Sequence, residues 1–187
     1  MAADADGWAR AERAGVARWI APCVTALVRS WRVEVVGWEH VTPGPQVFAL
    51  WHGHMAALLG GVGRVDRVVM LQAPLPQARF VAGVVAPLGI AFLEADTGSQ
   101  ALVRASRRVR DGWSVAIAVD GPAGPAFHAR SGASMLSRMT GLPVVPVTAE
   151  AKPAWSPPGF WDCAQVPWPL SRVVITASAP LPPPSGR

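Results

Sequence analysis

The chain has 187 residues, of which 51% are apolar and 16% charged, with a formal net charge of +5. This composition is too apolar for a disordered chain, and the length fits one domain with a core of ordinary size. The positive charge favours an anionic lipid surface as a partner, whereas nucleic acid is not expected because no basic block with interleaved aromatic residues is present.

The first 31 residues are predicted to form a separate N-terminal segment. An amphipathic helix is expected over residues 8–30, with Trp19, Cys23 and Leu27 on its apolar stripe. Trp and Arg around such a stripe suit a helix in a membrane interface, and packing on the chain's own domain is the equal alternative. We expect no secretory signal, since acids rather than a basic region open the sequence, and no run reaches the roughly 20 apolar residues of a membrane span.

Short apolar runs alternate with helical segments through residues 32–180, which we expect to form one domain. Strands are predicted at 31–38, 46–51, 66–71, 90–95, 113–120, 142–149 and 172–178. Helices are predicted after His54, at 77–89, from a cap at Thr97 or Ser99 through 110, and from Ser131 to Gly141. Residues 152–170 are expected to form a loop, and residues 181–187 a frayed, extended Pro-rich tail. This alternation predicts an α/β fold with a mainly parallel sheet.

The two cysteines, Cys23 and Cys163, lie far apart and match no metal spacing. We therefore expect both to be reduced thiols in the core of a cytosolic protein.

Two segments follow strands at the edge where α/β sheets place their active sites. The run "LWHGH" brings His52 and His54 after the second strand, and "VDGPAGP" brings Asp120 to the end of the strand at 113–120. A loop containing Gly121 and Gly124 can approach a ligand closely and offer backbone N–H groups to an anion. The alternative is structural, with His52 filling space at a strand end and Asp120 serving a turn.

In this order, "FALWHGH", "VDGPAGP", "TGLPVVPV" and "WDCAQVPWPLS" resemble the lysophospholipid acyltransferase-like superfamily, specifically a bacterial domain-of-unknown-function branch. The resemblance spans residues 32–180 and implies a central mixed sheet flanked by helices. It also implies membrane-associated transfer of a fatty acyl chain from acyl-coenzyme A or acyl carrier protein to a lipid hydroxyl. His52 then corresponds to the general base and Asp120 to the acid of the third motif. Gly121 and Gly124 would shape a loop whose N–H groups stabilise an oxyanion.

The sequence departs from the family pattern at three positions. The acid that family members carry five residues after the histidine is replaced by Ala57. The arginines of the second and third motifs fall on Glu94 and Ala123. A methyl group loses the bidentate contact to phosphate and a carboxylate repels phosphate, so a simple lysophosphatidate is not the expected acceptor.

Several residues remain candidates for the site because of these departures. The acid that orients His52 is expected at Glu94, Asp96 or Asp120. Substrate contacts are expected from residues near the two motifs, namely Trp51, His54, Glu94 and Arg130.

Two readings stay open. The chain is either an acyltransferase, cytoplasmic and peripheral on the inner face of the cell membrane, or a catalytically inactive lipid- or acyl-binding protein. A carboxylate within hydrogen-bond reach of the His52 ring would favour the enzyme. A lesser alternative is a zinc site built on His52 and His54 with His128 or His40 as third ligand; no resident metal or cofactor is expected.

Overall fold

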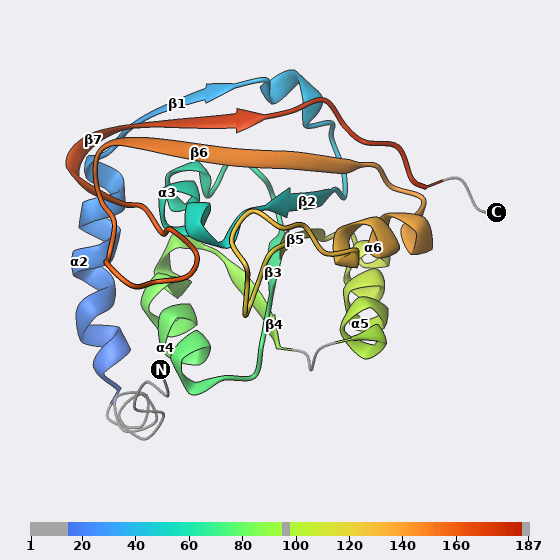
Figure 1. Ribbon diagram of the computed structural model, residues 1–187, viewed down its shortest axis with the longest axis horizontal. Helices are drawn as coiled ribbons and strands as arrows, with labels where there is room; N and C mark the ends of the chain where they lie inside the picture. The colour runs from blue at the N-terminus through green and yellow to red at the C-terminus, as the bar shows by residue number, and fades with distance from the viewer. Residues whose placement is uncertain (1–14, 95–97, 185–187) are drawn as a thin grey trace.

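The computed structural model describes residues 15–94 and 98–184. Within them, seven strands form one sheet in the order β1-β7-β6-β2-β5-β3-β4 (Figure 1). Neighbouring strands run parallel throughout, except that β6 and β7 are antiparallel. The predicted α/β fold with a mixed, mainly parallel sheet is confirmed.

The elements follow one another along the chain as β-strands joined by helices or short turns. The strands are β1 (Arg32–Val36), β2 (Val47–Leu50), β3 (Val68–Gln72), β4 (Ala91–Glu94), β5 (Ser114–Ala118), β6 (Val144–Trp155) and β7 (Val166–Ala177). The helices are α2 (Val16–Ser30), α3 (Met55–Leu58), α4 (Pro76–Val85), α5 (Ser99–Arg110) and α6 (Gly132–Thr140). Single 3₁₀ turns are η1 (Trp38–His40), η2 (His52–His54), η3 (Leu59–Gly61) and η4 (Ala86–Leu88).

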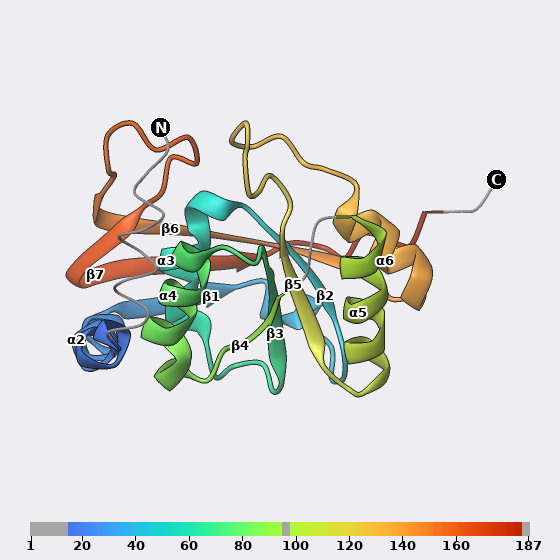
Figure 2. The ribbon, with the colours of Figure 1, turned by 90° about the horizontal axis from the view of Figure 1, so that it is seen from below.

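Helices cover both faces of the sheet, so its central strands are buried on both sides. Alternate residues of β2 show this, since Phe48 packs with the residues of α2 and α3 and Val47 packs with those of α5 and α6. Figure 2 shows α2, α3 and α4 on one side of the sheet and α5 and α6 on the other. The apolar runs of β2 and β5 are typical of such doubly covered strands.

The N-terminal helix packs on its own domain through part of its predicted stripe. Leu27 of that stripe is partly buried against the core, whereas Trp19 and Cys23 are exposed. The fully buried residues of the helix, Ala21 and Val28, were not among those predicted for the stripe. The Arg18 guanidinium lies 5.3 Å from the centre of the Trp19 ring. Residues 8–14 of the predicted helix lie outside the described residues.

The largest error in the predicted elements concerns residues 152–170. Both β6 and β7 are twelve residues long and form a hairpin that extends well into this segment, with Trp155 opposite Val166. The prolines suggested a loop because proline removes a ladder hydrogen bond. The hairpin accommodates Pro153 at a register shift between Lys152 and Ala154.

Three smaller expectations were also wrong. Cys23 and Cys163 are free but exposed rather than in the core. Gly98, rather than Thr97 or Ser99, occupies the cap of α5, whereas Ser131 and Gly141 flank α6 as predicted. Leu181 is not frayed, because it exchanges two backbone hydrogen bonds with Val144, at 2.8 and 2.9 Å.

Candidate active site

The register of two central strands brings the two predicted motifs together. Leu50 of β2 is paired with Ala118 of β5 in a parallel ladder, so the residues two positions further on, His52 and Asp120, emerge side by side. The backbone N–H of His52 donates to Asp120 Oδ1 at 2.8 Å. Because both strands end here, the site lies at the carboxyl edge of the sheet, as predicted from the sequence.

Asp120 is completely buried, and both of its carboxylate oxygens accept backbone hydrogen bonds. The second oxygen, Oδ2, accepts the N–H of Phe127 at 3.1 Å, across the loop that follows β5. Asp120 therefore ties the His52 turn to residues 120–130, and contacts the backbone of His52 rather than its ring.

The acid at the His52 ring is Asp162, which was not among the residues expected there. His52 Nδ1 lies 2.7 Å from Asp162 Oδ2, and the side chain of Asp162 is only 7% exposed. An Nδ1–H that donates to a carboxylate leaves the lone pair of the ring on Nε2. The His52 side chain is 36% exposed, so this ring combines a buried orienting acid with access for a substrate.

The loop that carries Asp162 is held against the His52 turn by a close backbone approach. Gly53 makes this possible, since a Cβ built on it would lie 2.0 Å from the carbonyl oxygen of Asp162. The N–H of Gln165 donates to the Gly53 carbonyl at 3.1 Å, and the N–H of Ala164 donates to Asp162 Oδ1 at 3.2 Å. The glycine of "WHG" thus permits the distant loop to deliver its carboxylate.

Gly121 and Gly124 contribute space on the other side of the ring. A Cβ on Gly121 would lie 3.2 Å from His52 Cδ2, and one on Gly124 would lie 2.5 Å from the indole of Trp161. Trp161 in turn packs on the imidazole, with ring centres 5.1 Å apart. The N–H groups of the two glycines donate within the loop, to Ala118 and Asp120 carbonyls at 3.3 and 3.1 Å.

His54 lies next to this arrangement and has a structural partner. Its Nδ1 is 3.2 Å from the backbone nitrogen of Ala149, so Nδ1 accepts and the proton of the neutral ring is on Nε2. Burial lowers the pKa of His54, which outweighs the opposite effect of the Asp120 and Glu150 carboxylates. The ring also lies 6.0 Å from that of Phe127.

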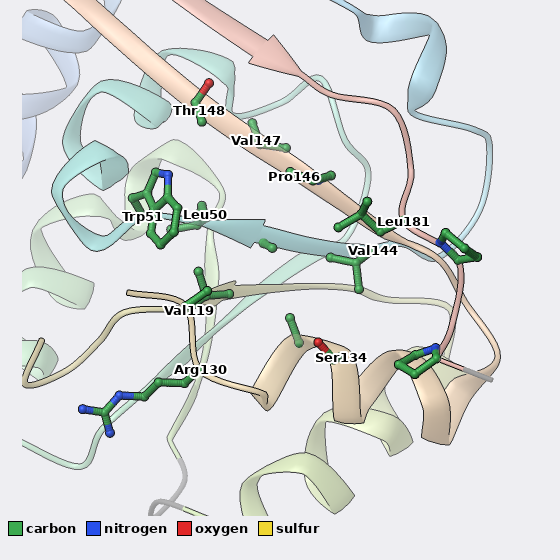
Figure 3. A pocket seen from close by; sticks show the side chains of 15 residues that line it. Leu50, Trp51, Val119, Arg130, Ser134, Val144, Pro146, Val147, Thr148 and Leu181 are labelled. Carbon is green, nitrogen blue, oxygen red and sulfur yellow. The ribbon is translucent and has the colours of Figure 1, made fainter. Parts of the chain in front are cut away.

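A mostly apolar cavity of about 260 Å³ lies beside the site, between α6 and strands β2 and β6. Figure 3 shows Trp51 and Val119 at the left of this cavity and Leu181 at its right. Trp51 also packs edge-on against Phe127, at 5.6 Å between ring centres. Arg130 lines the cavity, and its guanidinium donates to the Gly124 carbonyl at 2.7 Å.

The remaining predicted positions have surroundings of their own in the structure. Glu94 forms a bidentate ion pair with Arg79, and this hydrogen bonding lowers the pKa of the Glu94 carboxyl. Ala57 of α3 is fully buried in the apolar core, and Ala123 is exposed in the loop after β5. Asp96 lies outside the described residues.

The zinc alternative finds no support in the described ranges. Among residues 15–94 and 98–184, no three His, Cys, Asp or Glu side chains gather where they could hold a metal ion. The rings of two candidate ligands are hydrogen-bonded elsewhere, His40 to the Ala177 carbonyl and His128 to the Ala126 carbonyl, each at 3.0 Å.

Across residues 15–94 and 98–184, no helix is long and apolar enough to cross a bilayer.

The arrangement of strands and helices is similar to that of one solved enzyme structure. The fold is similar to that of the crystal structure of the 1-acyl-sn-glycerophosphate acyltransferase PlsC from Thermotoga maritima, with a TM-score of 0.55 and 18% identity. The match covers 93% of this chain and 74% of that one. No family model matches the sequence, and no curated protein matches it. The chain therefore shares the acyltransferase fold.

Proposed function

We propose that the protein is a membrane-associated acyltransferase that moves a fatty acyl chain from a thioester carrier to a lipid hydroxyl. The observation that carries the proposal is the 2.7 Å hydrogen bond between Asp162 and the partly exposed ring of His52. A histidine that only filled space would not need a buried carboxylate aimed at one ring nitrogen. The shared fold with PlsC and the sequence motifs support the same reaction class.

In this reaction His52 is the general base and Asp162 its positioning residue. Nε2 of His52 takes the proton of the acceptor hydroxyl as the oxygen attacks the thioester carbonyl carbon. The tetrahedral intermediate then collapses, the C–S bond breaks, and the thiol leaves with the proton that His52 held. Asp162 holds the required tautomer and stabilises the imidazolium between these two steps.

The donor is acyl-coenzyme A or acyl carrier protein, and the acceptor is a lipid other than a simple lysophosphatidate. The position of the third-motif arginine is the exposed Ala123, and the position of the second-motif arginine is Glu94, whose carboxylate is paired with Arg79. A phosphate would therefore lack both expected guanidinium contacts. The apolar cavity beside Trp51 is a suitable place for part of a hydrocarbon chain. We place the enzyme in the cytoplasm, peripheral on the inner face of the cell membrane.

Thiol release from a panel of acyl-coenzyme A and acyl-carrier-protein donors tests this function. Lysophosphatidate, monoacylglycerol and a bacterial lipid extract serve as acceptors, and wild type is compared with His52→Ala. We expect acceptor-dependent release to fall by about 10²- to 10⁴-fold in the variant. The matched control is His40→Ala. Because β1 runs antiparallel to β2, His40, which follows β1, lies at the edge of the sheet opposite to the one where His52 follows β2.

Equal release by wild type and His52→Ala across the panel would overturn the enzymatic proposal. The catalytically inactive lipid- or acyl-binding protein would then take its place.

A further inference from the structure

The hairpin that carries Asp162 presents an aromatic surface on its outer side. Four large side chains of the segment 155–170 are more than half exposed: Trp155 at 53%, Phe160 at 57%, Trp168 at 54% and Leu170 at 64%. We call these four residues the hairpin face. Burial of an indole is strongly favourable, so several uncovered aromatic side chains on one loop indicate a surface that meets an apolar partner.

Strand register places the two tryptophans together. Trp155 of β6 is paired with Val166 of β7, and Trp168 follows Val166 by two residues. Because side chains alternate along a strand, both indoles lie on the same face of the hairpin. The ladder therefore places the two indoles of the hairpin face, whereas Phe160 lies in the loop between the strands and Leu170 in the stretch of β7 where the register shifts.

The charge distribution of the hairpin fits an anionic lipid interface. Between Pro153 and Ser171 the sole acidic or basic side chain is Asp162, which is buried against His52, so the hairpin face is uncharged. Lys152 and Arg172 stand opposite each other just behind it, both exposed, with Arg172 also paired to Glu34. Indoles at the headgroup level with cations alongside are the pattern of a surface held in the interface of an anionic membrane.

The loop of the hairpin also lies on the same side of the molecule as the loop that follows β5 (Figure 2). Figure 2 shows the β6–β7 loop and the loop between β5 and α6 extending from the same side of the molecule. His52 contacts both loops, through Trp161 and Asp162 on one and Gly121 on the other. A bilayer seated on the hairpin face would therefore lie near the two loops that contact His52.

We propose that the hairpin face seats the protein on a bilayer that contains anionic lipid. The inference rests on the proposed function in taking a membrane lipid as the acceptor. It goes further because it assigns the membrane-docking surface to the β6–β7 hairpin that carries Asp162.

Vesicle sedimentation of the full chain tests the proposal. Vesicles of phosphatidylcholine alone are compared with vesicles of phosphatidylcholine mixed with phosphatidylglycerol, and indole quenching by brominated lipid reports insertion. We expect binding to the anionic vesicles, a loss of at least about tenfold in Trp155→Ser/Trp168→Ser, and weaker dependence on the anionic lipid in Lys152→Gln. The control is Val103→Ser/Met139→Ser, which removes side chains 41% and 48% exposed on α5 and α6.

Two results would overturn the proposal. One is sedimentation of the double tryptophan variant with anionic vesicles to the same extent as wild type. The other is a dimer of wild type that the same variant dissociates, without vesicle binding, which would make the hairpin face a contact between copies. Circular dichroism and thermal unfolding of each variant establish that it is folded. Vesicle binding is measured without any enzymatic turnover. The result therefore stands even if wild type and His52→Ala both prove to be inactive in the thiol-release assay.

Discussion

Replacing Asp162 by asparagine is the sharpest single test of the site. In the folded protein one carboxylate oxygen accepts from His52 Nδ1 at 2.7 Å and the other accepts from the N–H of Ala164 at 3.2 Å. An amide has one acceptor oxygen, so Asp162→Asn can satisfy only one of these two donors. If the amide NH₂ faces His52, the imidazole becomes protonated on Nε2 and cannot take the proton of the acceptor.

The size of the effect follows from that loss of tautomer control. A correctly oriented general base contributes about 10²- to 10⁴-fold, and the rate of Asp162→Asn should fall by a factor in that range. This corresponds to about 2.7–5.4 kcal/mol of activation free energy at 1.36 kcal/mol per tenfold. Loss of one hydrogen bond to a charged group costs about 1.5–3 kcal/mol of stability, so the variant should unfold at a lower temperature and still fold.

Two measurements separate a positioning role from a structural one. Steady-state thiol release should show kcat reduced with KM little changed, because the acceptor does not bind Asp162. Nitrogen NMR of the imidazole should report the proton moving from Nδ1 to Nε2. An Asp162→Asn enzyme that keeps kcat within about twofold of wild type, at a temperature where both are folded, would refute the reasoning.

The sequence was informative about the part of the site that local patterns determine. The apolar runs at 46–51 and 113–120 indicated buried strands; the first is followed directly by His52, and the second ends on Asp120. Parallel pairing of β2 with β5 then makes His52 and Asp120 neighbours without any further information. The contact between them, from a backbone N–H to a buried carboxylate, depends on side-chain geometry that no periodicity encodes.

Asp162 could not be predicted in the same way, although "WDCAQVPWPL" was noted as a motif. It lies 110 residues from His52 in the chain, in a segment whose prolines masked the alternation of a strand. Its approach depends on the absence of a side chain at Gly53. Glu94 was an equally reasonable candidate on charge alone, and only its ion pair with Arg79 shows that its carboxylate is engaged elsewhere.

Three further substitutions test the packing and protonation around His52. Gly53→Ala places a methyl group 2.0 Å from the Asp162 carbonyl oxygen, so we expect a lower unfolding temperature and loss of thiol release. The control is Gly132→Ala, which should change neither, because no atom lies within 4 Å of a Cβ at that position. Ala57→Asp buries an unpaired carboxylate in the apolar core, so it should lower the free energy of unfolding, measured in urea, by about 3–5 kcal/mol. A decrease below about 1 kcal/mol would mean that the new acid finds a partner. His54→Gln tests the lowered pKa of His54, whose ring accepts the N–H of Ala149. The unfolded chain binds a proton near pH 6.5 while folded His54 binds one at lower pH, so stability is lost as the pH falls below about 6.5. Glutamine can accept the same N–H without titrating. The variant should therefore lose less stability than wild type between about pH 7.5 and pH 5, and equal losses in the two proteins would show that His54 does not contribute to the acid sensitivity.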